Sequence, residues 1–287
     1  MRSKILLVTA ITALFSAGSA ISQDRWADAK ITSQPVSGSV HMLEGMGGNI
    51  GISAGPEGIL IIDDQFAPLA EKIAAAIGDI AQTPMKYVVN THYHGDHTGS
   101  NAYFTEIKGS TIFAHDNVRK RLANKEDHTH SELPVVTYQQ GITFHFNGDT
   151  IKVMHMPAGH TDSDSVVWFE DADVLHPGDL FFEGRFPFID LDGGGTVAGY
   201  ITNVTKLIGM LKEDTKIIPG HGSLATKADY QKALDMLVDT AAMVKSMKIK
   251  GVSLEDAVMQ GLGEKYTAWA WNFITEEKWI TTLYKGQ

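Results

Sequence analysis

The chain has 287 residues with 34 acidic and 24 basic side chains, which gives a formal net charge of -10. An acidic protein of this size repels a phosphate backbone, so we expect no nucleic acid among its partners. The sequence contains no cysteine. This excludes disulfide bonds and thiolate ligands, so any metal ion must be held by histidine, aspartate, glutamate or water.

The first twenty residues have the composition of a secretory signal peptide. Arg2 and Lys4 precede a mostly apolar run at 5–15, and small residues follow as far as Ala20. The apolar run is too short to span a bilayer, and the stop-transfer charges of the alternative, an N-terminal membrane anchor, are missing. We expect cleavage after Ala20, a periplasmic or secreted protein without stable membrane association, and a single mature domain at 21–287.

Beyond the leader, the first half of the chain alternates β patterns with helical patterns. Turns rich in glycine separate runs of β-branched residues, and an alanine-rich segment with helical spacing follows them. We predict strands at 38–43, 48–54, 58–63, 85–90 and 111–114, and helices at 67–80, 99–104 and 116–123. The polar residues 125–140 are predicted to be irregular.

The second half repeats this arrangement, and no linker separates it from the first. We predict strands at 142–146, 149–155, 164–169, 173–176 and 215–218, and helices at 197–211 and 226–247. Such a mixture allows two sheets that are each covered by helices. Composition and periodicity alone indicate only an α/β or α+β protein.

The densest group of metal-binding residue types lies in the segment THYHGDHTG at 91–99. Three histidines and an aspartate fall within six positions: His92, His94, Asp96 and His97. The first two histidines can point the same way only from extended chain, because residues two apart do not share a helical face. The glycine after them permits a bend that turns the other two donors toward the same cavity. Four donors exceed what one ion takes from a single loop, so the spacing indicates two adjacent metal ions.

The pattern His-X-His-X-Asp-His after a strand resembles the metal motif of the metallo-β-lactamase-fold hydrolases. Further motifs of that family follow in the same order: Gly159-His160-Thr161, Gly178-Asp179 and Pro219-Gly220-His221-Gly222. The strand and acidic pair at 59–64 also resemble a motif near the start of that domain. The resemblance covers about residues 36–225, and it implies a four-layer αββα sandwich.

The resemblance also implies a site for two divalent metal ions. His92, His94 and His160 match the ligands of the first ion, while Asp96, His97 and His221 match those of the second. Asp179 matches the aspartate that bridges the two ions in glyoxalase II-like members. Many true lactamases carry cysteine there or lack a bridging residue. Zinc is the default metal, and the added carboxylate makes iron and manganese the alternatives.

These donors are suited to hydrolysis, because a divalent ion lowers the pKa of a bound water toward about 7. Asp96 is the candidate catalytic residue, since it can orient the nucleophile and later deliver a proton beside its role as a ligand. Asp63 and Thr161 are candidates to fix the orientation of the histidines. For Asp63, a turn after a strand is an equal alternative.

Two segments are candidate substrate contacts in the family's pattern: a glycine-rich flap at 43–49 and a loop at 183–195. Lactamases with the bridging cysteine usually carry a lysine three residues later, where this chain has Phe182. Arg185 is the candidate residue to bind a substrate carboxylate instead, and a surface arginine is the alternative. Four aromatic residues could either form an apolar wall of the cavity or pack in the core beneath the loop: Phe181, Phe182, Phe186 and Phe188.

The remaining histidines and one basic cluster receive a structural interpretation. His128 and His130 form a second His-X-His pattern in a polar segment, which indicates a surface loop rather than an auxiliary role. Five histidines on predicted strands are expected to be satisfied or exposed rather than ligands: His41, His115, His145, His155 and His176. The cluster at 119–121 is expected to be a solvated helix turn.

The expected function is that of an exported, binuclear metal-dependent hydrolase acting on a small molecule. The β-lactam ring is the favoured substrate, because antibiotics are met outside the cytoplasm. Lactone or thioester hydrolysis with the same ligands is the alternative. A non-catalytic periplasmic metal-binding protein is a third interpretation, since a fold alone does not establish activity, but a degenerate relative would have lost ligands. The sequence leaves the oligomeric state open.

Overall fold

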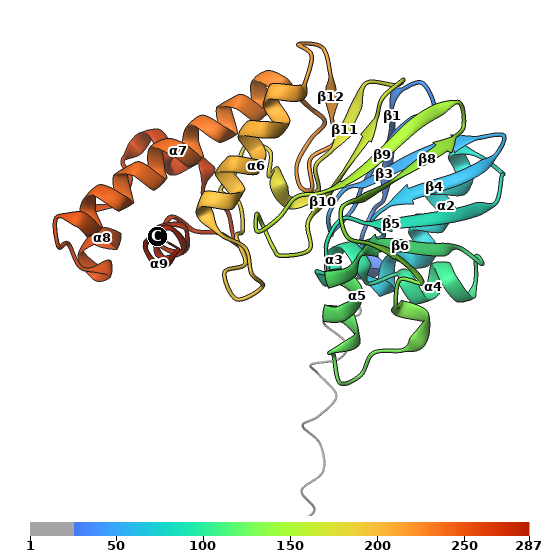
Figure 1. Ribbon diagram of the computed structural model, residues 1–287, viewed down its shortest axis with the longest axis horizontal. Helices are drawn as coiled ribbons and strands as arrows, with labels where there is room; N and C mark the ends of the chain where they lie inside the picture. The colour runs from blue at the N-terminus through green and yellow to red at the C-terminus, as the bar shows by residue number, and fades with distance from the viewer. Residues whose placement is uncertain (1–25, 287) are drawn as a thin grey trace, which may run out of the picture.

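The computed structural model describes residues 26–286, and the predicted signal peptide at 1–20 lies outside the described residues. Two sheets pack face to face, and helices cover the outer face of each sheet (Figure 1). The predicted four-layer αββα sandwich is therefore confirmed. No helix within residues 26–286 is long and apolar enough to cross a membrane.

The first sheet has seven strands whose order in space is their order in the chain. The first four strands pair antiparallel as a meander, and the last three are added in parallel. Its strands are β1 (Thr32–Ser37), β2 (Val40–Glu44), β3 (Ile50–Gly55), β4 (Gly58–Ile62), β5 (Met85–Asn90), β6 (Thr111–His115) and β7 (Val136–Tyr138).

The second sheet has six strands in the order β13-β12-β11-β10-β9-β8. Only β11 and β12 pair in parallel, and the other pairs are antiparallel. Its strands are β8 (Gly141–Phe146), β9 (Asp149–His155), β10 (Ser165–Phe169), β11 (Val174–His176), β12 (Lys216–Ile217) and β13 (Ala225–Thr226).

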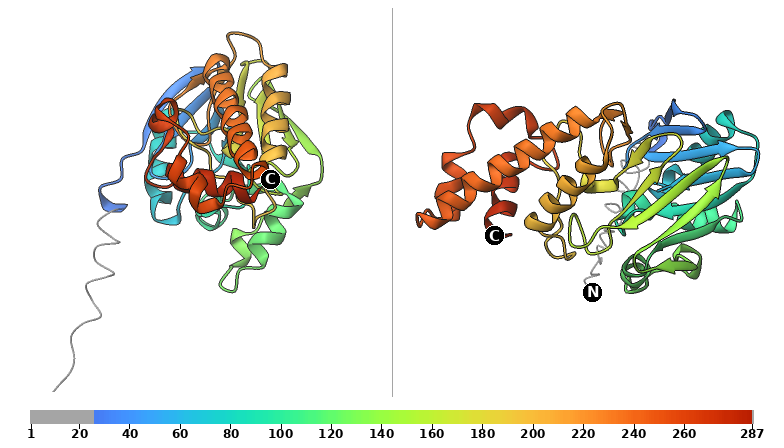
Figure 2. Two further views of the ribbon diagram at one scale, coloured as in Figure 1. Left: turned by 90° about the vertical axis from the view of Figure 1, so that its left-hand side faces the viewer. Right: turned by 45° about the horizontal axis from the view of Figure 1, so that its top comes forward.

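The helices divide between the two outer faces. The first sheet is covered by η1 (Ala67–Leu69), α2 (Ala70–Ile80), α4 (Asn101–Glu106) and α5 (Asp116–Ala123), and η2 (His130–Glu132) follows α5. The second sheet is covered by α6 (Val197–Met210) and α7 (Lys227–Ile249), which α8 (Leu254–Gln260), η4 (Glu264–Trp269) and α9 (Glu276–Lys285) extend. Figure 2 shows α7 to α9 at the end of the molecule farthest from the first sheet.

The strand β4 shows how the sequence builds the layers. All five of its residues are buried, as expected for a strand covered on both faces. Leu60 and Ile62 face the core between the two sheets, whereas Ile59 and Ile61 face the core under α2. This alternation follows from the two-residue period of a strand.

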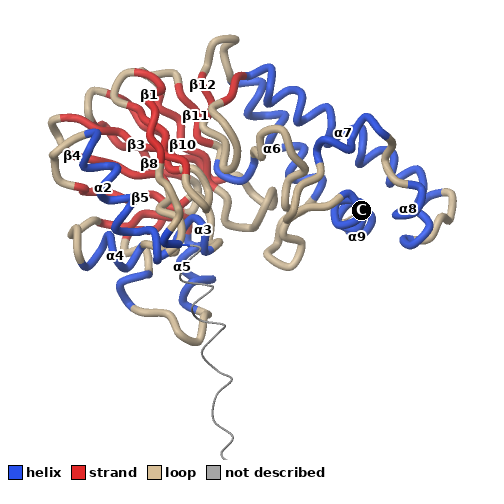
Figure 3. Tube along the Cα trace, turned by 180° about the vertical axis from the view of Figure 1, so that it is seen from behind, coloured by secondary structure: helices blue, strands red, loops and turns tan. Residues whose placement is uncertain are grey.

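The loops that follow β5, β9, β11 and β12 meet at one edge of the sandwich (Figure 3). The first of them forms α3 (Gly95–Thr98), and the loop after β11 forms η3 (Gly178–Leu180). The predicted metal motifs lie on these four loops. The pairing of the strands therefore brings together segments that are more than 120 residues apart in the sequence.

The structure differs from the sequence predictions mainly at the sheet edges. The edge strands β1 and β7 were not predicted, and β7 and η2 lie in the segment 125–140, which is not irregular throughout. The C-terminal helices α8 and α9 lie in a part of the chain for which no element was predicted. The remaining predicted elements are confirmed to within about two residues at most ends.

Three of the five histidines expected to be structural make ring contacts or hydrogen bonds, and His145 is exposed. The rings of His115 and His155 stack with their centroids 3.7 Å apart. His155 Nδ1 donates to the Asp164 carbonyl oxygen at 2.8 Å, and the buried His176 ring lies 3.2 Å from the Asn49 carbonyl oxygen. None of the five belongs to a group of candidate metal ligands among residues 26–286.

From the stacking of His115 on His155 we predict that the protein is less stable in acid. Burial lowers the pKa of both His115 and His155 below 6.5, and each positive ring would repel the other, although Asp116 and Asp162 partly offset this for His115. The unfolded chain then binds more protons than the folded chain below pH about 6.5, so stability falls as the pH falls through that value. We expect His155→Gln to lose fewer degrees of Tm than wild type between pH 7.5 and 5.5. Equal losses in metal-loaded samples of the two proteins would exclude this role for the pair.

Candidate metal centre

The structure brings the seven sequence-predicted ligands into two adjacent groups. In each group, one nitrogen or oxygen atom of every side chain lies within 4.8 Å of those of the others. The first group consists of His92, His94, His160 and Asp179, and the second of Asp96, His97 and His221. These are the two sets that the sequence motifs imply, with Asp179 placed in the first.

Asp179 lies between the two groups and faces both. Its Oδ2 lies 3.7 Å from His92 Nε2 and 3.4 Å from His160 Nε2, on the side of the first group. Its Oδ1 lies 3.1 Å from His97 Nε2 and 3.5 Å from His221 Nε2, on the side of the second group. One carboxylate thus presents one oxygen to each group, which is the geometry that a bridging ligand requires.

The buried histidines of the first group are held by the nitrogen that faces away from the site. His92 Nδ1 lies 3.0 Å from the Thr91 hydroxyl, and His160 Nδ1 donates to the Phe188 carbonyl oxygen at 2.7 Å. The opposite nitrogens, both Nε2, face Asp179. Hydrogen bonds of this kind fix the tautomer and the ring orientation of a metal-binding histidine.

The Asp63 carboxylate gives the second group the same support. Its Oδ2 lies 2.7 Å from His97 Nδ1 and accepts from the Thr91 hydroxyl, while its Oδ1 accepts from the Thr91 backbone N–H. Asp63 follows β4 with φ of 63°, a conformation that non-glycine residues rarely adopt and that tends to occur at functional sites. Asp63 therefore has the orienting contact expected from the sequence. Thr161 does not, because its hydroxyl bonds to Asp164 and Ser163 rather than to a histidine ring.

The inward-facing atoms fit the divalent ions implied by these residue types. His92 Nε2, His97 Nε2 and Asp179 Oδ1 are buried and lack a hydrogen-bond partner within the described structure. A buried polar atom left without a partner costs about 1–3 kcal/mol. Imidazole nitrogen and carboxylate oxygen are ligands for zinc and similar ions. Ions bound in these groups would satisfy the three atoms at once.

The protonation of four donors also suits metal binding. Burial lowers the pKa of His92 well below 6.5 and that of His160 to about 4, so both rings are neutral at neutral pH. Burial opposes ionisation of Asp179, but the surrounding histidines, His97 foremost, hold its pKa well below the usual range. His97 also outweighs burial at Asp96 and lowers its pKa to about 2. Both carboxylates are therefore ionised.

The other two titrated donors carry a proton that an ion must displace. Burial disfavours the charged form of both rings, but Asp179 outweighs burial and raises the pKa of His97 well above 6.5 and that of His221 to about 9.

Two glycines allow backbone to approach the site closely. A Cβ at Gly48, in the flap, would overlap the His97 ring, and one at Gly220 would overlap the Asp179 carboxylate. Asn49 connects these two glycine segments, since its side-chain N–H groups donate to the Pro219 and Gly222 carbonyl oxygens at 2.8 and 2.7 Å. The flap is thereby fixed to the loop that carries His221.

The end of the loop 183–195 supports a predicted ligand instead of lining the cavity. Asp190 Oδ2 lies 3.0 Å from His94 Nε2 and accepts from the Tyr93 hydroxyl at 2.5 Å, and the hydrogen bond with His94 lowers the pKa of Asp190. His94 Nδ1 is thereby left facing His160 Nε2, 2.9 Å away. The first half of the loop lines the cavity with Arg185 and Phe188, whereas its second half does not.

Arg121 completes this support, which corrects the interpretation of the basic cluster at 119–121. Its guanidinium donates twice to the Asp162 carboxylate at 2.7 and 2.8 Å, and once to the Gly193 carbonyl oxygen at 2.8 Å. The same group lies 4.7 Å from the centre of the Tyr93 ring. The cluster does lie on the helix α5, but Arg121 is engaged with the loops around His94 rather than solvated.

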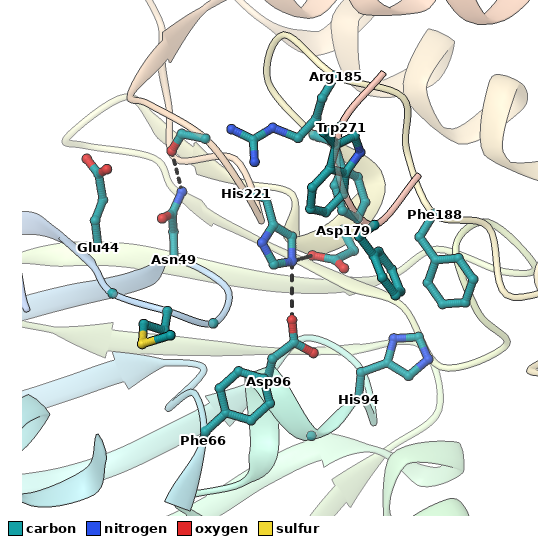
Figure 4. Close-up of a pocket in the computed structure, with 17 residues that line it drawn as sticks. Glu44, Asn49, Phe66, His94, Asp96, Asp179, Arg185, Phe188, His221 and Trp271 are labelled. Carbon is teal, nitrogen blue, oxygen red and sulfur yellow. Dashed lines mark hydrogen bonds and ion pairs between the residues drawn. The ribbon is translucent and has the colours of Figure 1, made fainter. Parts of the chain in front are cut away.

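A cavity of about 790 Å³ opens over the two groups. Figure 4 shows Asp96, Asp179 and His221 in its middle, with Phe66 at one edge of the view and Arg185 and Trp271 at the opposite edge. The Asp96 side chain is 26% exposed, so it can meet a bound molecule. The flap contributes Gly45, Met46 and Gly47 to the lining.

The structure separates the four aromatic residues of the substrate segment. Phe182 and Phe188 line the cavity, and the Phe182 ring stacks on His221 with the centroids 4.9 Å apart. Phe181 and Phe186 are core residues that stack on Tyr230 and Trp279. Arg185 also lines the cavity, as expected of a substrate contact. His128 and His130 are exposed and do not line it.

Sequence reasoning did not assign the roles of Asn49, Tyr93 and Asp190, although they lie in predicted site segments, and it missed Trp271 and Phe273 entirely. The run of three glycines at 193–195 was a signal of close backbone packing near Asp190. The two C-terminal aromatic residues stand in no recognisable motif.

Comparisons with known proteins agree with this geometry. The sequence model of the metallo-beta-lactamase superfamily matches residues 52–221. The chain is 22% identical over 183 residues to metallo-beta-lactamase type 2 of Bacillus sp. (strain 170), covering 63% of this chain and 69% of that protein. It is 30% identical over 96 residues to hydroxyacylglutathione hydrolase of Methylococcus capsulatus, covering 33% of this chain and only 34% of that protein.

Solved structures show the same fold. The metallo-beta-lactamase from Pontibacter korlensis superposes with a TM-score of 0.63 at 19% identity, covering 72% of this chain and 99% of that one. At this level of identity the similarity concerns the fold alone.

Proposed function

The chain belongs to the metallo-beta-lactamase superfamily, and we propose that it is an exported hydrolase with two divalent metal ions, zinc by default, acting on the β-lactam ring of a small molecule. The observation that carries the two-metal part of this proposal is the position of Asp179, whose two carboxylate oxygens face two separate groups of donors. Seven donors arranged in this way are more than one ion requires. Export rests on the composition of the leader at 1–20.

Bound divalent ions supply a nucleophile at neutral pH and polarise a substrate carbonyl. The chain's own residues do the remaining work. Asp96 reaches the cavity and stands beside His97 and His221, where its carboxylate can orient the attacking group and carry a proton to the leaving atom. Phe182 and Phe188 exclude water from one side of the reacting bond.

Arg185 is the proposed contact for a substrate carboxylate. It is the only lysine or arginine among the described residues that line the cavity. Phe182 stands where lactamases with a bridging cysteine carry the carboxylate-binding lysine, so this chain needs another cation for that contact. An arginine suits it, because its planar fork pairs with both oxygens of a carboxylate.

The second candidate function is hydrolysis of a lactone or thioester. It is supported by the ligand set without cysteine and by the similarity to a hydroxyacylglutathione hydrolase. The lactamase proposal is supported by the leader and by the longer match to a metallo-beta-lactamase. A non-catalytic metal-binding protein is disfavoured, because all seven donors are retained and a cavity opens above them.

A hydrolysis panel separates these functions. Penicillins, cephalosporins, carbapenems, lactones and glutathione thioesters are offered to metal-loaded wild type, Arg185→Ala and the control Arg119→Ala, whose side chain does not line the cavity. We expect lactam hydrolysis, with KM values that are high unless Arg185 supplies the charge that binds the substrate carboxylate. Loss of one charge-assisted contact of about 1.5–3 kcal/mol should lower kcat/KM in Arg185→Ala by about one to two powers of ten. Activity on lactones or thioesters alone would overturn the lactamase proposal, and an unchanged Arg185→Ala would remove that residue from substrate binding.

A further inference from the structure

One wall of the cavity comes from the C-terminal segment 269–275, between η4 and α9. Trp271 and Phe273 of this segment line the cavity. Both residues lie outside the segment 52–221 that matches the family. The metal groups and this wall therefore come from different parts of the chain, and the shared chemistry of the family does not account for the wall.

Hydrogen bonds and packing fix the wall in place. The Trp271 indole N–H donates to the Phe186 carbonyl oxygen at 2.9 Å, and the Phe186 N–H donates to the Trp269 carbonyl oxygen at 2.7 Å. Trp279 of α9 is fully buried, and its ring stacks on Phe186 with the centroids 5.5 Å apart. The C-terminal segment is thus attached to the loop that carries Arg185 and Phe188, and it is a fixed part of the site.

The wall forms a continuous aromatic surface from the metal groups to the mouth of the cavity. The Phe188 ring lies 5.7 Å from His94 and 5.4 Å from Phe273, and Phe273 lies 5.5 Å from Trp271. Phe273 is 49% exposed, and Met46 of the flap is 41% exposed. Large apolar side chains that remain exposed around a concave site mark a surface for an apolar ligand.

Arg185, the cation that lines the cavity, contacts the same wall. The Arg185 guanidinium lies 5.2 Å from the centre of the Trp271 ring, and its Nε–H donates to the Glu183 carbonyl oxygen at 3.2 Å. Within residues 26–286, no carboxylate forms an ion pair with Arg185. Figure 4 shows the guanidinium beside Trp271 at the edge of the cavity. One charged contact and one broad aromatic contact are therefore adjacent.

We infer that this site selects amphipathic acids, meaning substrates with one anionic group and one aromatic or bulky apolar group, and that Trp271 and Phe273 determine this specificity. The anion pairs with Arg185, the apolar group lies on Phe273 and Phe188, and the bond to be broken lies over Asp179. The inference rests on the proposed function for that last placement and for the contact between Arg185 and the anion. A substrate without the apolar group would leave the wall exposed to water.

Binding of matched acids tests the inference without turnover. The affinities of metal-loaded protein for 4-phenylbutyrate and butyrate, which differ only in the phenyl group, are measured by calorimetry. We expect wild type to bind 4-phenylbutyrate about tenfold or more tightly than butyrate. Phe273→Ala should reduce this preference by about three- to tenfold, and Phe273→Leu by less. Phe273 is half exposed, so its truncation should leave the fold and the metal content unchanged.

A control variant tests whether the loss of phenyl preference is specific to Phe273. Ile249→Ala truncates an apolar side chain that is 77% exposed at the end of α7, and it should keep the full preference for the phenyl group. Equal affinity of wild type for the two acids, or a preference that survives Phe273→Ala, would overturn the inference. If the hydrolysis panel shows no turnover while the phenyl preference falls in Phe273→Ala, the proposed function fails and this inference stands. Turnover without a phenyl preference would support the proposed function and overturn this inference.

Discussion

Wild-type protein loaded with zinc should contain about two ions per chain, and Asp179→Ala should contain one or fewer. The reason is geometric, because the two oxygens of Asp179 face different groups of donors and its loss weakens both. A bound ion contributes several kcal/mol of transition-state stabilisation, so activity on any accepted substrate should fall by at least about three powers of ten. Elemental analysis gives the metal content, and the hydrolysis panel gives the activity.

Two further variants act as matched controls for this loss. His160→Ala removes a donor from the first group, and His221→Ala removes one from the second. Each should lower the metal content to about one ion per chain, and circular dichroism should show that both variants remain folded. Two tightly held ions in Asp179→Ala would show that this residue does not bridge. Full occupancy in both histidine variants would show that the division into two groups is incorrect.

The interior of the fold is predictable from the sequence because its signals are local. The strand β9 and the helix α5 coincide with their predicted ranges, since alternation along a strand and apolar spacing along a helix report burial directly. The edge strands of the first sheet lack this signal. The strand β1 is partly exposed and includes Pro35, which an edge strand tolerates because one side of its backbone needs no hydrogen-bond partner. The strand β7 has only three residues, two of them exposed.

The candidate site likewise contains residues that a local motif identifies and residues that only the folded chain brings together. Each predicted ligand lies in a short motif, so the seven residues are visible in the sequence before any contact is known. Asp190 and His94 are 96 residues apart, and the Trp271 indole and its partner Phe186 are 85 residues apart. No local pattern reports such contacts, which only the folded chain creates. Sequence reasoning therefore misses the roles of Asp190, Trp271 and Phe273, which depend on such distant contacts.

The Asp190 contact predicts an effect on one metal group only. Asp190→Asn keeps the size of the side chain but removes the charge that accepts hydrogen bonds from His94 and Tyr93. The His94 ring then keeps at most a weaker, uncharged hydrogen bond at Nε2, so the orientation that points its Nδ1 toward the first group is held less firmly. Loss of such a supporting contact typically lowers metal affinity by about 10- to 100-fold. We expect this loss at the first group, a smaller one in Tyr93→Phe, and none at the second group, whose His97 is held by Asp63.

Titration of the protein against a zinc chelator resolves the two dissociation constants and needs no substrate. Asp192→Asn is the matched control, because it removes the same charge from the same loop at an exposed position, and it should leave both constants unchanged. Equal weakening of the two groups in Asp190→Asn would indicate a general loosening of the loop rather than orientation of His94. If Asp192→Asn weakened zinc binding at the first group as much as Asp190→Asn does, the cause would be the lost negative charge of the loop rather than the contact with His94. A selective loss at the first group, graded from Tyr93→Phe to Asp190→Asn, is expected only if Asp190 acts through His94.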